Sequence, residues 1–111
     1  MWEKGRQNGN YFKKKLFQSK VFRLDCWLIK YLENSFIEKH KDPCPKGFTH
    51  KRINIILNRP LQGGEFNCLK YKSYFNKRVI FFYPSEYFHY LTPIKKGSRL
   101  VLSIGWLSKN N

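Results

Sequence analysis

The sequence predicts an all-β domain built as a barrel or a sandwich. Several short stretches of the 111-residue chain place apolar residues at alternate positions, and turn residues separate these stretches. The clearest alternation runs through residues 52–58 and gives two faces: Ile53, Ile55 and Leu57 on one, and Arg52, Asn54, Ile56 and Asn58 on the other. The length fits one domain, in which aromatic residues (18% of the chain) compensate for a small core.

We expect three parts: an N-terminal flank at 1–21, the β-domain at 22–107 and a tail at 108–111. Residues 11–20 place Phe12, Leu16 and Phe17 on one stripe, which predicts a short basic helix or loop in the flank. Its lysines either face solvent or face a polyanion.

Within the domain, residues 22–31 predict a first core strand whose two apolar faces are buried between layers. Residues 36–41 predict a second strand, and residues 78–83 a buried one. Gly63-Gly64 predicts a tight bend, residues 70–77 a basic aromatic loop and residues 89–97 a hairpin-like connection. The last strand has two faces, one with Leu100, Leu102, Ile104 and Trp106 and the other with Arg99, Val101 and Ser103.

The formal net charge of +15 leaves a nucleic-acid partner open, because clustered cations release counterions from phosphates. A different cause competes with this reading. Lysine is abundant along the whole chain and alanine is absent, as an AT-rich coding sequence would produce. We therefore expect the lysines to scatter over all faces rather than to gather on one.

The cysteines and the hydropathy pattern favour a cytoplasmic, reducing location. Three cysteines, Cys26, Cys44 and Cys68, form no disulfide framework and no Cys-x-x-Cys pair. No apolar run approaches the length of a membrane-spanning helix, and the first residues lack an apolar signal segment. The sequence predicts neither membrane insertion nor a particular oligomeric state.

His40-Lys41-Asp42 is the clearest candidate for metal chemistry. Residues two apart on a strand share a face, so His40 and Asp42 present an imidazole nitrogen and a carboxylate oxygen to a common point. A two-histidine, one-carboxylate Fe(II) site needs one more histidine and leaves positions open. His89 lies 47 residues beyond Asp42. His50 competes with His40 but has no carboxylate two positions away, which favours a pocket-rim or surface position.

Four features follow one another along the chain: the His-x-Asp triplet, the Gly63-Gly64 turn, His89 and, ten residues later, Arg99. In this order they resemble the oxygenases that use Fe(II) and 2-oxoglutarate, particularly their prolyl-4-hydroxylase-like branch. The resemblance covers roughly residues 22–106. It implies a double-stranded β-helix (jelly-roll) core. It also implies a dioxygenase that decarboxylates 2-oxoglutarate oxidatively with molecular oxygen, releases succinate and carbon dioxide, and hydroxylates an unactivated C–H bond.

The resemblance also implies the roles of single residues. The metal ligands are His40, Asp42 and His89, with no further catalytic residue. Arg99 pairs its planar fork with the distal carboxylate of 2-oxoglutarate. Tyr31 matches a tyrosine that donates its hydroxyl to the cosubstrate, and a tyrosine that only fills the core is the alternative.

Arg52 and Asn54 are expected beside the cosubstrate if their strand face points into the barrel, with solvent exposure on an edge strand as the alternative. Two positions depart from the family pattern. Ile56 stands where relatives carry a second cosubstrate-contacting tyrosine, and Val101 stands where many carry Ser or Thr.

The prime substrate stays open. A peptidyl residue such as proline follows from the branch alone, and a small molecule such as a free amino acid or a nucleic-acid base is a further candidate. A non-catalytic basic β-barrel that binds nucleic acid is the alternative function. A degenerate relative is a third reading, because the chain lacks the longer helical flank that usually supports the major sheet.

Overall fold

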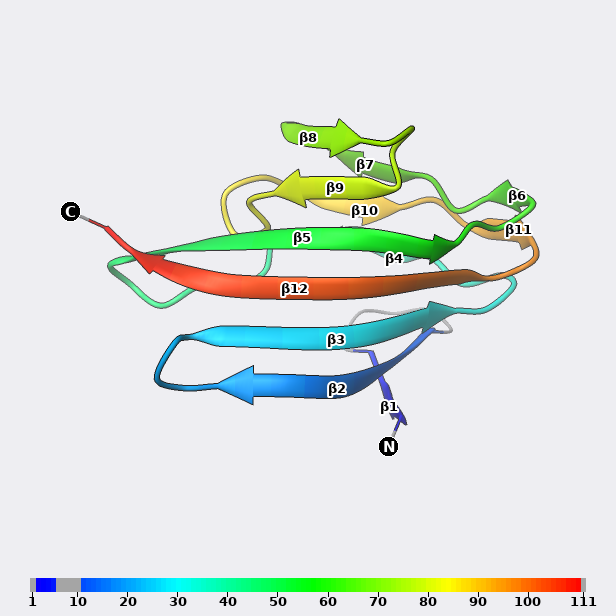
Figure 1. Ribbon diagram of the computed structural model, residues 1–111. Helices are drawn as coiled ribbons and strands as arrows, with labels where there is room; N and C mark the ends of the chain where they lie inside the picture. The colour runs from blue at the N-terminus through cyan, green and yellow to red at the C-terminus, as the bar shows by residue number, and fades with distance from the viewer. Residues whose placement is uncertain (1, 6–10, 111) are drawn as a thin grey trace.

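The computed structural model describes residues 2–5 and 11–110, and all regular structure in these ranges is β-strand (Figure 1). A seven-stranded major sheet has the order β1-β2-β3-β12-β5-β9-β8, and a three-stranded minor sheet has the order β4-β10-β7. A two-stranded ribbon pairs β11 with β6. The antiparallel sheets confirm the predicted all-β jelly-roll class. The described residues contain no helix that is long and apolar enough to cross a membrane.

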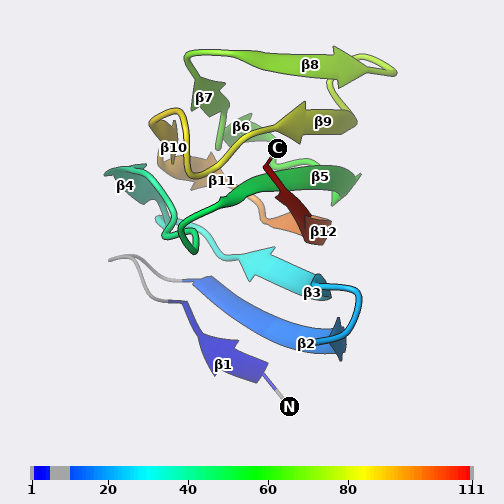
Figure 2. The same cartoon turned by 90° about the vertical axis from the view of Figure 1, so that its left-hand side faces the viewer.

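The strand bounds are as follows. The major sheet holds β1 (Trp2–Lys4), β2 (Tyr11–Ser19), β3 (Leu24–Tyr31), β12 (Arg99–Lys109), β5 (Phe48–Asn58), β9 (Val79–Phe82) and β8 (Tyr71–Tyr74). The minor sheet holds β4 (Ile37–His40), β10 (His89–Leu91) and β7 (Phe66–Cys68), and the ribbon holds β6 (Gln62–Gly63) and β11 (Ile94–Lys96). In Figure 2 the major sheet runs from β1 at the bottom to β8 at the top, and β1 and β2 extend below the minor sheet.

The predicted helix at residues 11–20 is wrong, because residues 11–19 form β2. This strand pairs with β3 along its length and places Tyr11 in the core, stacked on Tyr31 with the ring centroids 5.3 Å apart. Backbone pairing and ring packing outweigh the weak helical pattern of this basic stretch.

Three further expectations need correction. Residues 71–74 form β8 instead of lying in a loop, because they pair with β9. The segment 89–97 is no hairpin, because β10 pairs with β4 and β7 whereas β11 pairs with β6. The first core strand begins at Leu24, and its residues before Tyr31 are half-buried or exposed rather than enclosed between layers.

β12 organises the major sheet, because it pairs with β3 on one side and β5 on the other. Its inner face carries Arg99, Val101, Ser103 and Gly105, which are all buried, and its outer face carries the large apolar residues, which are only half-buried. The polar-looking face of this strand is therefore the interior one. The predicted bend at Gly63-Gly64 is confirmed, since both glycines have positive φ (75° and 68°) and a Cβ on Gly63 would lie 2.2 Å from the Pro93 carbonyl oxygen.

The outer face of the major sheet is apolar and half-exposed. Strand register places on it, among others, Cys26, Leu28, Ile53, Ile55, Phe81, Leu102, Ile104 and Trp106. None of these side chains is fully buried. Within the described ranges, the core therefore lies between the two sheets and not behind the major one.

The contrast between enclosed and exposed positions predicts different costs for shortening two aliphatic side chains. Ile94 is 0% exposed and Leu61 is 74% exposed. We expect Ile94→Ala to lower the free energy of unfolding by about 2–5 kcal/mol, because it leaves a cavity in the core, and Leu61→Ala to change it by less than about 0.5 kcal/mol. Denaturant unfolding measures both. Equal losses would contradict this placement of the core.

Candidate metal centre and cosubstrate cavity

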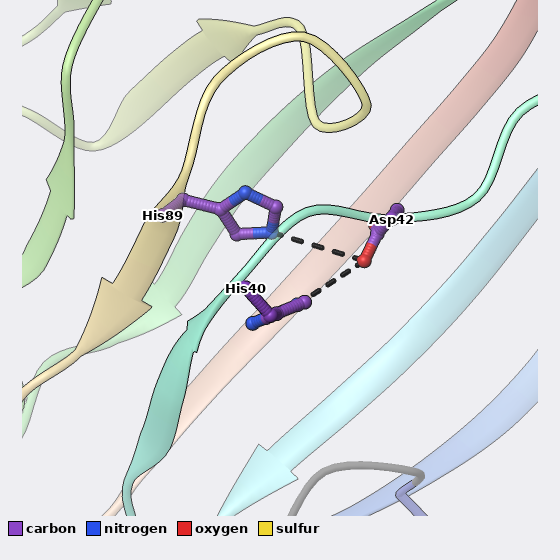
Figure 3. Close-up of side chains that lie close together, drawn as sticks. All are labelled: His40, Asp42 and His89. Carbon is purple, nitrogen blue, oxygen red and sulfur yellow. Dashed lines mark ion pairs between the residues drawn. The ribbon is translucent and has the colours of Figure 1, made fainter.

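The three predicted metal ligands converge at one end of the minor sheet. His40 ends β4 and lies directly opposite His89, the first residue of β10, so strand pairing holds the two rings with their centroids 4.3 Å apart. Asp42 Oδ1 lies 3.1 Å from His40 Nε2 and 3.9 Å from His89 Nε2 (Figure 3). One ligand atom from each residue falls within 4.8 Å of the others.

Asp42 reaches this point from a loop rather than from the predicted strand. β4 ends at His40, and the backbone N–H of Asp42 donates a hydrogen bond to the carbonyl oxygen of Pro84 (2.8 Å). The predicted convergence is therefore correct, but its cause differs. Cross-strand pairing aligns the histidines, and the loop contact with Pro84 helps to place the carboxylate.

Hydrogen bonds fix which nitrogen of each imidazole faces the carboxylate. His40 Nδ1 lies 2.7 Å from the Glu38 carbonyl oxygen, and His89 Nδ1 lies 3.2 Å from that of Tyr87. A carbonyl can only accept, so we assign a proton to each Nδ1, which leaves each Nε2 either with a lone pair or with a second proton. Two lone-pair nitrogens and a carboxylate oxygen facing one another are stabilised by a cation between them.

Burial and charge together favour that cation site. Burial would raise the pKa of the Asp42 carboxyl, but the hydrogen bond with His40 and the charges of His89, His40 and His50 hold this pKa below its ordinary value. Burial lowers the pKa of His89, which opposes a second proton on its ring. The site therefore offers an ionised carboxylate and at least one neutral imidazole at neutral pH.

A cavity of about 240 Å³ leads from these three residues across the inner face of the major sheet. It is lined by the triad, by all four predicted cosubstrate residues (Tyr31, Arg52, Asn54 and Arg99) and by the apolar side chains of Ile29, Ile37 and Leu91, among others. The structure thus brings every predicted site residue to one cavity.

Arg99 is a buried cation without a carboxylate partner. It is 4% exposed, and its guanidinium carbon lies 5.2 Å from the Tyr31 ring centroid. All seven acidic residues of the chain lie in the described ranges, and none of them forms an ion pair with Arg99. A buried guanidinium costs free energy unless it is paired or hydrogen-bonded, and the cavity beside Arg99 leaves room for an anion.

Arg52 and Asn54 both line the cavity, and some of their polar atoms already have protein partners. Arg52 donates to Asp25 Oδ1 (2.5 Å) and to Ser103 Oγ (2.7 Å), and Ser103 Oγ donates to Asn54 Oδ1 (2.6 Å). This four-residue chain spans β3, β5 and β12, and its members Arg52, Asn54 and Ser103 line the cavity. Sequence reasoning missed Asp25 and Ser103, although both stand at inward positions of their strands.

His50 is buried rather than on the surface, and it lines the same cavity. Its Nδ1 is enclosed and has no hydrogen-bond partner. Burial lowers the pKa of its ring, and the Arg52 charge lowers it further. His50, Arg52 and Asn54 stand at alternate positions of β5 and therefore share its inward face. This spacing was the sequence signal that could have placed His50 in the cavity.

No protein-family model matches the sequence, and no curated protein matches it. Among solved structures, a prolyl-4-hydroxylase from Pseudomonas putida is similar over 99% of this chain and 78% of its own, with a TM-score of 0.70 and 14% identity. An oxidoreductase of the 2OG-Fe(II) oxygenase family from Burkholderia pseudomallei is similar over 78% of this chain and 43% of its own (TM-score 0.56, 20% identity).

An HTH_3 family transcriptional regulator from Vibrio cholerae is similar over 90% of this chain and 52% of its own (TM-score 0.56, 14% identity). The chain thus spans about half or less of two of these three neighbours. The similarities establish the fold, and one fold carries several functions.

The buried histidines predict a pH dependence of stability for the metal-free protein. Because the folded-state pKa values of His50 and His89 are lowered, the unfolded chain binds more protons, and the stability should fall as the pH drops below the unfolded value of about 6.5. His50→Leu should reduce that fall. Thermal unfolding at pH 7.5 and 5.5 measures the effect, and an unchanged pH dependence in the variant would contradict the buried position of His50.

Proposed function

We propose that this protein is a dioxygenase that depends on Fe(II) and 2-oxoglutarate and hydroxylates an unactivated C–H bond. One observation carries the proposal. Two imidazoles and one carboxylate line the same cavity as a buried guanidinium, and no carboxylate of the described residues forms an ion pair with that guanidinium. This ligand set suits Fe(II), and the guanidinium suits the far carboxylate of a dicarboxylic acid.

The residues have separate tasks in this proposal. His40, Asp42 and His89 would hold the metal through three positions and leave the others for 2-oxoglutarate and oxygen. With metal and cosubstrate bound, the site would supply the oxidative decarboxylation: one oxygen atom enters succinate as carbon dioxide leaves, and the other enters the C–H bond as a hydroxyl. Arg99 would bind and orient the distal carboxylate, and Tyr31 would position the guanidinium.

We propose that Arg52 shapes the cavity and reaches the cosubstrate only through its surroundings, whereas Asn54 keeps its side-chain N–H donors for a ligand in the cavity. Both were expected to contact 2-oxoglutarate, but the Arg52 guanidinium donates to Asp25 and Ser103, and Asn54 Oδ1 accepts from Ser103. Ile56, which replaces a tyrosine of the relatives, is buried on the same inner face. Binding of the cosubstrate would therefore depend more strongly on Arg99 than in relatives in which a second tyrosine also contacts it.

The peptidyl substrate stays a prediction from the resemblance, together with a small-molecule alternative. A prolyl-4-hydroxylase is among the similar structures, and its identity of 14% supports the fold and not the substrate. The alternative function is a non-catalytic basic barrel that binds nucleic acid, which the net charge of +15 favours. Iron-dependent conversion of 2-oxoglutarate to succinate by the purified protein separates the two.

We expect the three proposed metal ligands to be equally necessary for metal binding. Removing one of three ligands takes away a third of the protein's coordination, so His40→Ala, Asp42→Ala and His89→Ala should each abolish stoichiometric Fe(II) binding. Anaerobic titration with Fe(II), or with Co(II) as a spectroscopic substitute, measures this. His50→Leu is the matched control and should keep the metal. Loss of metal in the control, or retention in a triad variant, would contradict the ligand set.

Arg99→Ala should raise the 2-oxoglutarate concentration needed for turnover by roughly ten- to a hundredfold, because a charge-assisted hydrogen bond contributes about 1.5–3 kcal/mol. Fe(II) affinity should stay nearly unchanged. Succinate formation against 2-oxoglutarate concentration measures the effect. Arg99→Lys should need a 2-oxoglutarate concentration between those of the unchanged protein and Arg99→Ala, because lysine keeps the positive charge but lacks the forked N–H donors of a guanidinium. An unchanged requirement would remove Arg99 from the proposed site.

A further inference from the structure

The end of the β2–β3 hairpin exposes large apolar side chains, and we call Leu16, Phe17, Val21 and Phe22 the apolar tip. In this order the four side chains are 49%, 52%, 80% and 76% exposed. Leu16 and Phe17 lie on the last part of β2, and Val21 and Phe22 lie in the turn that follows. Single apolar residues on a surface are ordinary, but a group of large ones indicates a contact surface.

Contacts to neighbouring strands hold this turn in a defined position. The backbone N–H of Phe22 donates to Ser19 Oγ (3.2 Å), and the backbone N–H of Leu107 on β12 donates to the Arg23 carbonyl oxygen (3.0 Å). The guanidinium carbon of Arg23 lies 4.7 Å from the ring centroid of Phe48, the first residue of β5. The apolar tip therefore projects from a backbone that is tied to two strands of the major sheet.

Cations surround the apolar tip. Lys20 and Arg23 directly flank its two turn residues along the chain. Lys46 and Lys109 are exposed at the same end of the molecule, where β5 begins and β12 ends (Figure 1). Asp25, the single acidic residue of the β2–β3 hairpin, already pairs with an arginine of β5. The tip therefore combines exposed apolar groups with positive charge that no carboxylate of its own hairpin offsets.

We propose that the apolar tip docks the protein on the surface of a membrane that contains anionic lipids. The apolar side chains would enter the boundary between headgroups and acyl chains, and the cations would pair with anionic headgroups, without any membrane-spanning segment. A single turn is too small to supply the roughly 800 Å² that each partner buries in a stable protein complex. A second copy of the chain would bring like charges together. The proposal goes beyond the dioxygenase function and does not depend on it.

Cosedimentation of the full chain with vesicles tests the docking surface. Vesicles of phosphatidylcholine mixed with phosphatidylserine should bind the protein, and vesicles of phosphatidylcholine alone should bind it at least about tenfold more weakly. V21S/F22S should weaken binding to the mixed vesicles at least about tenfold, because two large side chains lose their burial in lipid. K20E/R23E should also weaken it at least about tenfold at low salt, because each cation beside an anionic surface contributes about fivefold.

Two matched controls make the same changes on other elements. L61S/L69S removes two leucines that are 74% and 78% exposed, and K95E/K96E reverses two exposed lysines on β11. Each control should weaken vesicle binding less than about threefold. Equal losses from the two charge-reversal variants would overturn the proposal, because they would show attraction to the overall charge alone. Equal effects of the two serine variants would also overturn it, because the tip would then contribute no apolar contact.

Fluorescence quenching tests insertion of the tip directly and needs no loss of binding. Lipids brominated on their acyl chains should quench the added tryptophan of Phe22→Trp, whereas that of Leu61→Trp should stay unquenched because it remains in water. Equal quenching of the two variants, or no vesicle binding at low salt, would overturn the proposal. All of these measurements work without iron and 2-oxoglutarate, so their failure would leave the proposed dioxygenase function untouched.

Discussion

The pairing of β12 with both β3 and β5 is the constraint on which the rest of the structure depends. This one strand fixes the register of its neighbours, so that Arg99 lies beside Tyr31 and Ser103 lies between Trp27 and Asn54. Because directly opposed residues in antiparallel strands share a face, the register also decides which side chains enter the cavity. A slip of one residue would turn Arg99 outward and place Leu100 inside.

Short-range patterns in the sequence predict much of this arrangement. Alternation marked β5 and β12 correctly, and the Gly63-Gly64 pair marked a real bend. His40, Asp42 and His89 were predicted to converge, and their convergence is confirmed. These features succeed because each depends on local geometry or on a few residues whose chemistry suits one purpose.

The features that sequence reasoning missed depend on pairing between distant strands. Nothing within residues 11–20 shows that β3 presents a free edge to them, so a weak helical stripe misled the prediction for β2. Asp25, Arg52 and Ser103 meet only once three strands are in register. For His50 the sequence left a pocket-rim and a surface position open, and only the surface position is wrong. The choice between them requires knowing which face of β5 points inward.

The chain of hydrogen bonds from Asp25 through Arg52 and Ser103 to Asn54 restricts how this sequence can change over generations. Loss of Asp25 alone would leave the Arg52 guanidinium half-buried without its counter-charge, whereas joint replacement of both by apolar residues removes charge and partner together. The effects of substitutions here should therefore be strongly non-additive. Lineages that depart from this arrangement are expected to change these positions together and rarely one at a time.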